Sequence, residues 1–328
     1  MQKINKSIEI VRSNVKGLSS MGGGSARAIM AVLDERYVDV TISVVNTVSD
    51  LEALVDRAPD LVFLGMKYVP GSLAGTKVWL SDFFDEHHIT YTGSGESSYR
   101  LEANKHLAKK VVASAGLDTS LFNVVRRGST FNTSSTLRFP LFVKPTNRGG
   151  GQGIDSDSVV HTPAQLDAKI AQIASLLGAD ALLEEYLPGR EFSVAILKND
   201  DNSLSAMPIE LIAGPDKRGV RMLSQAIKSS NTEEALAVTD LPLRTKINDL
   251  ALGVFAALGA RDYGRIDIRL DQFGTPHFLE ANLIPSLTSG YGSFPKACVL
   301  NADISYGPMI LSIAKAGMNR ADSVAVLA

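Results

Sequence analysis

The sequence lacks the features that mark several large classes of protein. One cysteine, Cys298, occurs among 328 residues, so the chain cannot form an internal disulfide, and no Cys/His cluster suggests zinc. No apolar run approaches the roughly 20 residues that a membrane helix needs, and the first residues carry no apolar signal-peptide core. The net charge of −2 supplies no general basic field for nucleic acid. We therefore expect a cytoplasmic protein that has neither a membrane nor a nucleic acid as its partner.

What is present predicts a globular chain of three domains. Hydrophobic residues make up 45% of the sequence and charged residues 21%, which is typical of folded proteins. Residues 25–93 alternate between helix-like and strand-like patterns, and this alternation predicts a parallel sheet covered by helices. The predicted domains are an N-terminal parallel α/β domain over 1–95, a small central domain over 96–180 and a larger C-terminal α+β domain over 181–328.

Two segments give more specific expectations. Residues 97–116 predict one long helix, ended by Gly116 at a position where glycine commonly stops helices. Residues 213–235 are polar and weakly periodic, which predicts a loop or lid. We expect this loop and the glycine-rich residues 147–153 to lie between the last two domains.

The segment 263–290 predicts a β-hairpin with an unusual number of polar side chains. Side chains alternate between the two faces of a strand. Alternation places Arg265, Asp267 and Arg269 on one face of the first strand, Phe278, Glu280 and Asn282 on one face of the second, and Leu279 and Ala281 on its other face. A symmetric register gives three cross-strand pairs: Arg265 with Asn282, Asp267 with Glu280, and Leu270 with His277.

The paired acids of this hairpin favour a divalent cation. Like charges directly opposite one another destabilise a sheet, so a positive group is expected between Asp267 and Glu280. Mg²⁺ takes hard oxygen ligands, usually one or two carboxylates, and the Asn282 amide oxygen could add a third. The alternative is a pair of solvated acids with Arg265 and Arg269 as partners. The spacing alone leaves both interpretations open.

A second motif, FPLFVKPTNRGGGQG, predicts a phosphate site. A strand over 139–145 delivers Lys144, and four glycines follow it at once: Gly149, Gly150, Gly151 and Gly153. Exposed backbone N–H groups in such a loop can cradle phosphate, and a lysine behind them adds positive charge. The alternative is a mobile hairpin loop without a ligand.

A third motif, LLEEYLPGREFSVAIL, could hold the base and the sugar of a nucleotide. One strand ends, and the next begins, with residues suited to this: Glu184, Glu185, Tyr186, Leu187 and Glu191. A strand edge with backbone groups and acids can bind an adenine amine and ribose hydroxyls. The alternative is an acidic edge that discourages aggregation.

The segment MGGGSARA, residues 21–28, is a competing signal for a dinucleotide. It matches the first two glycines of the Rossmann fingerprint, but Arg27 occupies the third position. We expect no strand before it, and a fingerprint requires one. An oxidoreductase built on this segment is therefore the weaker interpretation.

Together and in this order, these motifs resemble the ATP-grasp superfamily and, within it, the D-alanine–D-alanine ligase family. The likeness covers most of the chain and is strongest over 89–197 and 263–297. It implies a three-domain ATP-grasp fold, ATP and Mg²⁺ as cofactors with Mn²⁺ as an alternative metal, small amino-acid or peptide substrates, and a homodimer.

The resemblance also implies a role for each matching residue. The nucleotide contacts would be Lys105, Lys144, Gly149, Gly150, Gly151, Gly153, Glu184, Glu185, Tyr186, Leu187, Glu191, Lys228 and Leu279. Asp267, Glu280 and Asn282 would hold Mg²⁺. Arg265, helped by the backbone around Ser286, would stabilise the oxyanion, and Tyr291 or Ser293 would hold the second substrate's carboxylate. In the implied mechanism a carboxylate attacks the γ-phosphate of ATP, and an amine then attacks the resulting acyl phosphate.

The sequence departs from the family's pattern where the first substrate binds. The family's N-terminal glutamate, which holds an ammonium group, has no clear match. Its His-Gly…Gly-Glu-Asp-Gly stretch is replaced by LGMKYVPGSLAGTK, which has neither histidine nor acid. Gly150 replaces a lid serine, and Ser229 replaces the tyrosine after Lys228. We therefore expect an ATP-dependent ligase whose substrate is altered from D-alanine. The alternative is an ATP-binding regulator without catalysis.

Overall fold

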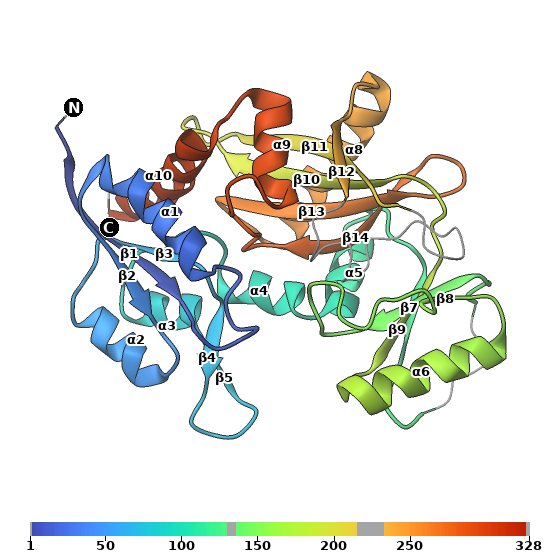
Figure 1. The fold of residues 1–328 in the computed structure, drawn as a ribbon. Helices are drawn as coiled ribbons and strands as arrows, with labels where there is room; N and C mark the ends of the chain where they lie inside the picture. The colour runs from blue at the N-terminus through green and yellow to red at the C-terminus, as the bar shows by residue number, and fades with distance from the viewer. Residues whose placement is uncertain (1, 130–135, 215–232, 326–328) are drawn as a thin grey trace.

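The computed structural model describes residues 2–129, 136–214 and 233–325, and Figure 1 shows their arrangement around three main sheets. The predicted nucleotide contact Lys228 and most of the predicted loop 213–235 lie outside the described residues. A parallel sheet with its helices forms the N-terminal part of the molecule. Two antiparallel sheets follow, and the cleft between them contains the site described below.

The N-terminal sheet has the order β2-β1-β3, and all of its pairings are parallel. Its strands are β1 (Ile4–Arg12), β2 (Tyr37–Val44) and β3 (Leu61–Leu64). Its helices are α1 (Gly23–Asp34), α2 (Val48–Val55) and α3 (Leu80–Glu86), and a small hairpin is formed by β4 (Tyr68–Pro70) and β5 (Lys77–Trp79). The predicted strand over 89–93 is reduced to an isolated bridge between Tyr91 and Val62.

The expectation that no strand precedes the glycine-rich turn is wrong, because β1 leads into it. The apolar run of β1 is interrupted by Glu9, which obscures the strand in the sequence. Glu9 is nevertheless buried, and its carboxylate accepts hydrogen bonds from the Arg57 guanidinium at 2.7 Å. A paired buried charge is tolerated in a central strand where an unpaired one is not.

The predicted helix over 97–116 is in fact two helices, α4 (Glu96–Glu102) and α5 (Lys105–Ser114). Asn104 leaves the helical conformation, with φ −130° and ψ 88°. The first N–H group of α5, that of Lys105, then donates to the carbonyl of Thr146 at 3.2 Å. The break therefore interrupts the helical hydrogen bonds at Asn104 and allows α5 to form a hydrogen bond with the segment that follows β7.

The central sheet has the order β6-β9-β7-β8 and is antiparallel. Its strands are β6 (Phe122–Val125), β7 (Leu141–Pro145), β8 (Val159–Val160) and β9 (Ala181–Glu185), and α6 (Pro163–Leu177) packs on one face (Figure 1). Thr162 caps α6, and Gly178 ends it at φ 59°. Because β9 pairs with β7, we propose that the central domain extends to Glu185, beyond the boundary expected at residue 180.

The C-terminal sheet has the order β12-β11-β10-β13-β14 and is antiparallel. Its strands are β10 (Glu191–Lys198), β11 (Leu204–Ile212), β12 (Glu234–Ala237), β13 (Tyr263–Leu270) and β14 (Pro276–Asn282). Its helices are α8 (Leu241–Ala257), α9 (Ser293–Ala302) and α10 (Tyr306–Ala325). In Figure 1, α10 lies beside α1, and residues of both helices share one buried core with β1.

No single described helix is long and apolar enough to cross a membrane. The helices α9 and α10 meet such a length and composition test only as a pair bent by 104°. Their apolar residues Phe294, Met309 and Ile313 are fully buried inside the protein.

The predicted register of the hairpin is confirmed for two pairs and wrong for the third. Arg265 pairs with Asn282, and Asp267 pairs with Glu280. A β-bulge then shifts the register, so that Leu270 lies opposite Pro276 and not His277. A bulge adds one residue to one strand and turns side chains to new faces.

The same bulge changes which side chains of β14 share a face. Phe278 was expected beside Glu280, but it is fully buried in the core with Ile268. Leu279 was expected on the opposite face from Glu280, but both residues line the pocket, which agrees with the role that the family resemblance implied for Leu279.

Candidate functional site

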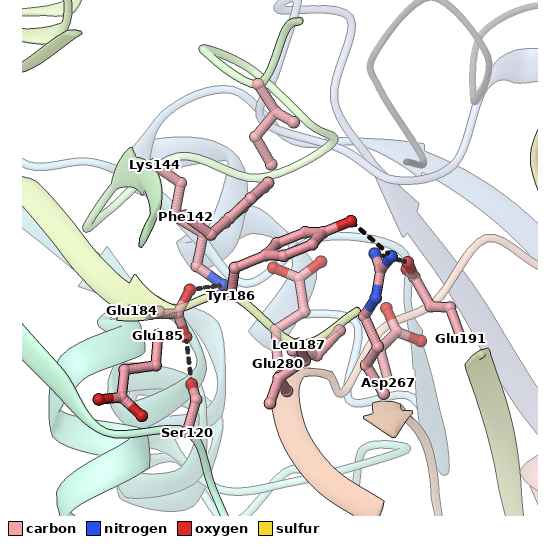
Figure 2. Close-up of a pocket in the computed structure, with 13 residues that line it drawn as sticks. Ser120, Phe142, Lys144, Glu184, Glu185, Tyr186, Leu187, Glu191, Asp267 and Glu280 are labelled. Atoms are coloured by element: carbon pink, nitrogen blue, oxygen red, sulfur yellow. Dashed lines mark hydrogen bonds and ion pairs between the residues drawn. The ribbon is translucent and has the colours of Figure 1, made fainter. Parts of the chain in front are cut away.

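A pocket lies where the central and C-terminal sheets face each other (Figure 2). The predicted site residues that line it are Lys144, Glu184, Glu185, Tyr186, Leu187, Glu191, Asp267, Leu279 and Glu280. The sequence did not single out four further lining residues for a ligand role: Ser120, Phe142, Ile154 and Arg269.

The wall formed by the central sheet contains a buried network of two lysines and one carboxylate. Lys144 on β7 and Lys109 on α5 both contact Glu184 on β9, with N–O distances of 2.7 and 2.6 Å. Burial alone lowers the pKa of a lysine, but the negative charges of Glu184 and Glu280 raise the pKa of Lys144 above its ordinary value. Lys144 therefore carries a fixed positive charge at the edge of the pocket.

Glu184 is held as a carboxylate by the same network. Burial favours its neutral form, but the two ammonium groups outweigh burial and lower the pKa of Glu184. Ser120 adds a longer hydrogen bond at 3.4 Å, which Figure 2 also marks. Both carboxylate oxygens thus have partners within the protein, so Glu184 orders Lys144 as well as lining the pocket.

Lys109 was not predicted as a site residue, although its position contains a signal. It follows Lys105 by four residues in α5, and this spacing puts two side chains on the same helical face. Burial lowers the pKa of Lys109 to about 8. Both lysines point from α5 toward the central sheet and β14.

The opposite end of the pocket is organised by Arg269. Its guanidinium donates to Glu191 at 3.0 Å, to the carbonyl of Gly189 at 3.2 Å and to the Tyr186 hydroxyl at 3.4 Å. Figure 2 shows the Tyr186 ring reaching across the pocket, and its hydroxyl is the acceptor of the 3.4 Å hydrogen bond from Arg269. The arginine thereby fixes two residues that the sequence assigned to the adenine and the ribose.

The C-terminal wall presents the paired acids of the hairpin. Asp267 accepts hydrogen bonds from Ser193 at 2.8 Å and from Arg265 at 2.9 Å. Glu280 approaches Lys105 at 3.5 Å. The negative charges are thus partly balanced by cations of the chain. Of the alternative interpretation only the Arg265 partner is present, because Asp267 is buried and Arg269 pairs with Glu191.

The donor set still fits a hard divalent cation. Asp267 and Glu280 are directly opposite across the strands, and Asn282 occupies the next position of the same face. No cluster of three or more His, Cys, Asp and Glu residues suited to a metal occurs in the described ranges. Two carboxylates and an amide suit Mg²⁺, which completes its coordination with water and phosphate oxygens.

Lys105 lies just behind Glu280, at the junction of α5 with the glycine-rich loop. Its ammonium donates to the carbonyl of Arg148, which lies within that loop. Burial lowers the pKa of Lys105, and the charge of Glu280 opposes this effect. Lys105 therefore links the loop to the acid-bearing strand β14.

The glycine-rich loop turns through left-handed backbone conformations that favour glycine. Gly150, Gly151 and Gly153 have φ values of 63°, 77° and 77°. A Cβ on Gly153 would lie 2.8 Å from side-chain atoms of Leu177 and Pro145. This geometry explains the glycines near the pocket, although it does not itself identify a phosphate ligand.

The residues expected at the substrate end do not line the pocket, but several of them are connected to it. Arg265 donates to Ser293 at 3.3 Å in addition to Asp267. The Ser286 hydroxyl lies 3.2 Å from that of Thr288, which in turn lies 2.8 Å from Ser25 on α1. This loop therefore joins the N-terminal domain to the strand that carries Arg265.

Tyr291 is held in the same loop by a backbone hydrogen bond to Thr288 at 3.1 Å. A Cβ on Gly292 would lie 3.3 Å from the Ser286 carbonyl, so the chain passes close to itself here. Which of Tyr291 and Ser293 contacts a substrate stays a prediction.

The altered stretch over 64–77 contributes a lysine that the sequence did not single out. Lys67 forms an ion pair with Glu102 at the end of α4. The second carboxylate oxygen of Glu102 is buried and has no hydrogen-bond partner among the described residues. The negative charge of Glu102 is also a minor influence among those that raise the pKa of Arg265. A charged pair thus lies on the stretch whose sequence departs from the ligase pattern that the motifs resemble.

Comparisons with known proteins agree on one family. Residues 111–314 match the family model described as the D-ala D-ala ligase C-terminus. A D-alanine–D-alanine ligase from Chlorobaculum parvum is 30% identical, and the aligned region covers 89% of this chain and 79% of that protein. An uncharacterised protein, y4sG, from Sinorhizobium fredii is 32% identical over 69% of this chain and 65% of its own length.

A solved structure supports the same fold. The D-alanine–D-alanine ligase of Bacillus anthracis, solved in complex with ATP, superposes with a TM-score of 0.77. The superposition covers 98% of this chain and 100% of that one, at 19% sequence identity. At this identity the likeness concerns the fold.

Proposed function

Because this chain belongs to the D-alanine–D-alanine ligase family of ATP-dependent, carbon–nitrogen bond-forming enzymes, we propose that it joins one small substrate's carboxyl group to another's amine. ATP would be converted to ADP and phosphate through an acyl phosphate. The observation that carries the proposal is the pocket in which Lys144 faces the paired acids Asp267 and Glu280. Cations and metal-binding acids on facing walls are what a bound triphosphate requires.

The nucleotide would occupy the pocket with its base near Tyr186 and Leu187. Glu191, oriented by Arg269, is placed to accept hydrogen bonds from ribose hydroxyls. Lys144 and Lys105 would neutralise phosphate oxygens, and the glycine-rich loop would cover them. Mg²⁺ bound by the acids of β13 and β14 would supply charge neutralisation for the transferring phosphoryl group.

Arg265 is the residue that we assign to the oxyanion. Its guanidinium is held between Asp267 and Ser293, and its Nε is buried without a hydrogen-bond partner among the described residues. A donor fixed in advance costs little reorganisation when negative charge develops on a tetrahedral intermediate. The Ser286 backbone would assist from the adjoining loop.

The substrates are small molecules with a carboxylate and an amine. The changes over 64–77, which include Lys67 paired with Glu102, support a first substrate other than D-alanine. A homodimer, a cytoplasmic location and the absence of membrane and nucleic-acid partners stay predictions from the sequence and the family.

Phosphate release from ATP tests this function. Purified protein should release phosphate with at least one pair from a panel of D-amino acids, L-amino acids and D-lactate. Asp267→Asn keeps the side-chain shape but weakens the metal site, so turnover should fall by about a hundredfold or more, which is the usual effect of removing one electrostatic interaction that stabilises a transition state. ATP binding without phosphate release from any pair would instead identify a non-catalytic regulator.

A further inference from the structure

Lys109 connects the two walls of the nucleotide pocket. It lies on α5 and is fully buried, with no exposed side-chain surface. Its ammonium donates to Glu184 on β9 and to the carbonyl of Phe278 on β14, at 2.6 and 3.2 Å. One cation thus contacts a strand of the central sheet and a strand of the C-terminal sheet.

On β14, the contact with Lys109 is made next to the β-bulge. Phe278 is the last residue before Leu279, the residue that the bulge turns into the pocket, and it precedes Glu280 by two positions. Its N–H group donates to the carbonyl of Asp118 at 2.9 Å, and its carbonyl also accepts from Thr119 at 2.9 Å. The backbone of β14 at Phe278, two residues before Glu280, is therefore held in place by α5 and by the segment that follows α5.

On β9, the contact of Lys109 with Glu184 determines the position of Lys144. The Glu184 carboxylate lies between Lys109 and Lys144, with one oxygen toward each (Figure 2 shows the Lys144 contact). Without Lys109, one carboxylate oxygen would retain only the 3.4 Å hydrogen bond with Ser120. The carboxylate could then rotate, and Lys144 would no longer have a fixed position against the nucleotide.

A fully buried ammonium is expensive unless its three donors are paired. Lys109 finds oxygen acceptors within 3.2 Å on Glu184, Thr119, Ser120 and Phe278. A methionine of similar length would fill the space beside the Phe122 and Phe278 rings, so the packing can be kept when the charge is removed.

We propose that Lys109 is a positioning residue for ATP: through Glu184 it holds Lys144, and through the Phe278 carbonyl it holds the metal-bearing part of β14. The inference rests on the proposed function, because it assigns Lys109 to the same nucleotide site. Lys109 itself does not line the pocket and touches no reacting atom.

ATP-dependent stabilisation and kinetics of Lys109→Met test this role. In this variant Glu184 still forms its ion pair with Lys144, so no buried charge is left without a partner and we expect a folded protein. The ATP-induced rise in Tm should shrink and the KM for ATP should rise about tenfold, the effect of one charge-assisted hydrogen bond, while kcat changes less. Lys110→Met, on the exposed face of the same helix, is the matched control and should behave as wild type.

A double variant decides whether Lys109 acts through Glu184. The loss of ATP affinity in Lys109→Met/Glu184→Gln should be clearly smaller than the sum of the two single losses, since residues in one network are not additive. Full additivity would overturn the inference. The inference would also be overturned if Lys109→Met bound ATP as tightly as the wild-type protein does. No ATP binding by wild type would instead overturn the proposed function, and this inference with it.

Discussion

At the scale of single residues, the site depends on buried charges whose protonation the surroundings control. Lys109 is faced by Glu184 on β9, Lys144 on β7 and Glu280 on β14. Burial is the largest influence and brings its pKa from 10.5 to about 8. The folded protein therefore releases this proton at a lower pH than the unfolded chain does.

This shift predicts a pH dependence of ATP use. Above pH 8 the native Lys109 loses its charge, so its hold on Glu184 weakens, and kcat/KM for ATP should decline by up to about tenfold. The decline should be absent in Lys109→Met and kept in Lys110→Met, when kcat/KM is measured from pH 6.5 to 9.5. An identical decline in all three proteins would assign it to another group.

The same shift has a consequence for stability with the opposite sign. Between about pH 8 and 10.5 the unfolded chain binds more protons at Lys109 than the native protein does. The contribution of this residue to the free energy of unfolding therefore rises with pH across that window, because the cost of burying the charge disappears. Activity and stability should thus change in opposite directions as Lys109 loses its proton.

Single residues were predictable where a local pattern determined them. The cross-strand pair Asp267–Glu280 follows from alternation and a symmetric turn, and the structure has it. The residues that balance the charges of these acids could not be predicted in the same way. Lys105 reaches Glu280 from a separate helix, and Ser193 reaches Asp267 from a strand 74 residues earlier. Such partners depend on how the sheets pack, which no local spacing records.

At the scale of elements, the glycine-rich loop makes a prediction that depends on position within the loop. Gly153→Ala would force a side chain into φ 77° and against Leu177 and Pro145. We expect a loss of about 1–2 kcal/mol in the free energy of unfolding from the backbone alone, and a higher KM for ATP.

Gly149→Ala supplies the matched control. No atom lies within 4 Å of a Cβ built there, and its backbone is not left-handed. Its unfolding free energy should stay within about 0.5 kcal/mol of wild type. Urea unfolding of both variants provides the comparison. Equal losses in the two would mean that the loop tolerates no side chain anywhere, whatever the local conformation.

Elements were predicted well where periodicity was regular and poorly where a tertiary contact overrode it. The helix α6 has a Thr162 cap, an early Pro163 and a terminal Gly178, which are boundary signals that a sequence displays locally. The break between α4 and α5 was missed because the Lys105 N–H group bonds to Thr146 of the central sheet. The strand β1 was missed because Glu9 interrupts its apolar run.

At the scale of the whole molecule, the predicted ATP-grasp ligase fold is confirmed, but its cores cross the expected domain limits. One buried cluster joins Ile8 and Ile10 of β1 with Ile29 of α1 and with Met309 and Ile313 of α10. The C-terminal helix therefore completes the core of the N-terminal sheet. This arrangement could not be predicted from the sequence, because each segment alone looks like an ordinary amphipathic element.

An ion pair next to this shared core makes the junction testable. Arg320 on α10 binds the Asp262 carboxylate and the backbone carbonyl of Tyr91. Asp262 is 1% exposed and also accepts from the N–H group of Gly93 at 2.8 Å. Arg320 therefore joins the end of the N-terminal domain to the start of β13, the strand that carries Arg265.

Removal of Arg320 should destabilise the whole molecule, because it leaves a buried carboxylate without its cation. Arg320→Leu is expected to lower the free energy of unfolding by about 3–5 kcal/mol, and Asp262→Asn in the same chain should restore part of it. Lys315→Leu is the control on the same helix. Its partner Asp200 is 72% exposed, and such surface pairs contribute about 1 kcal/mol or less. Calorimetry or urea unfolding of the four proteins measures the difference. Equal losses for Arg320→Leu and Lys315→Leu would show that α10 is held by its apolar face alone.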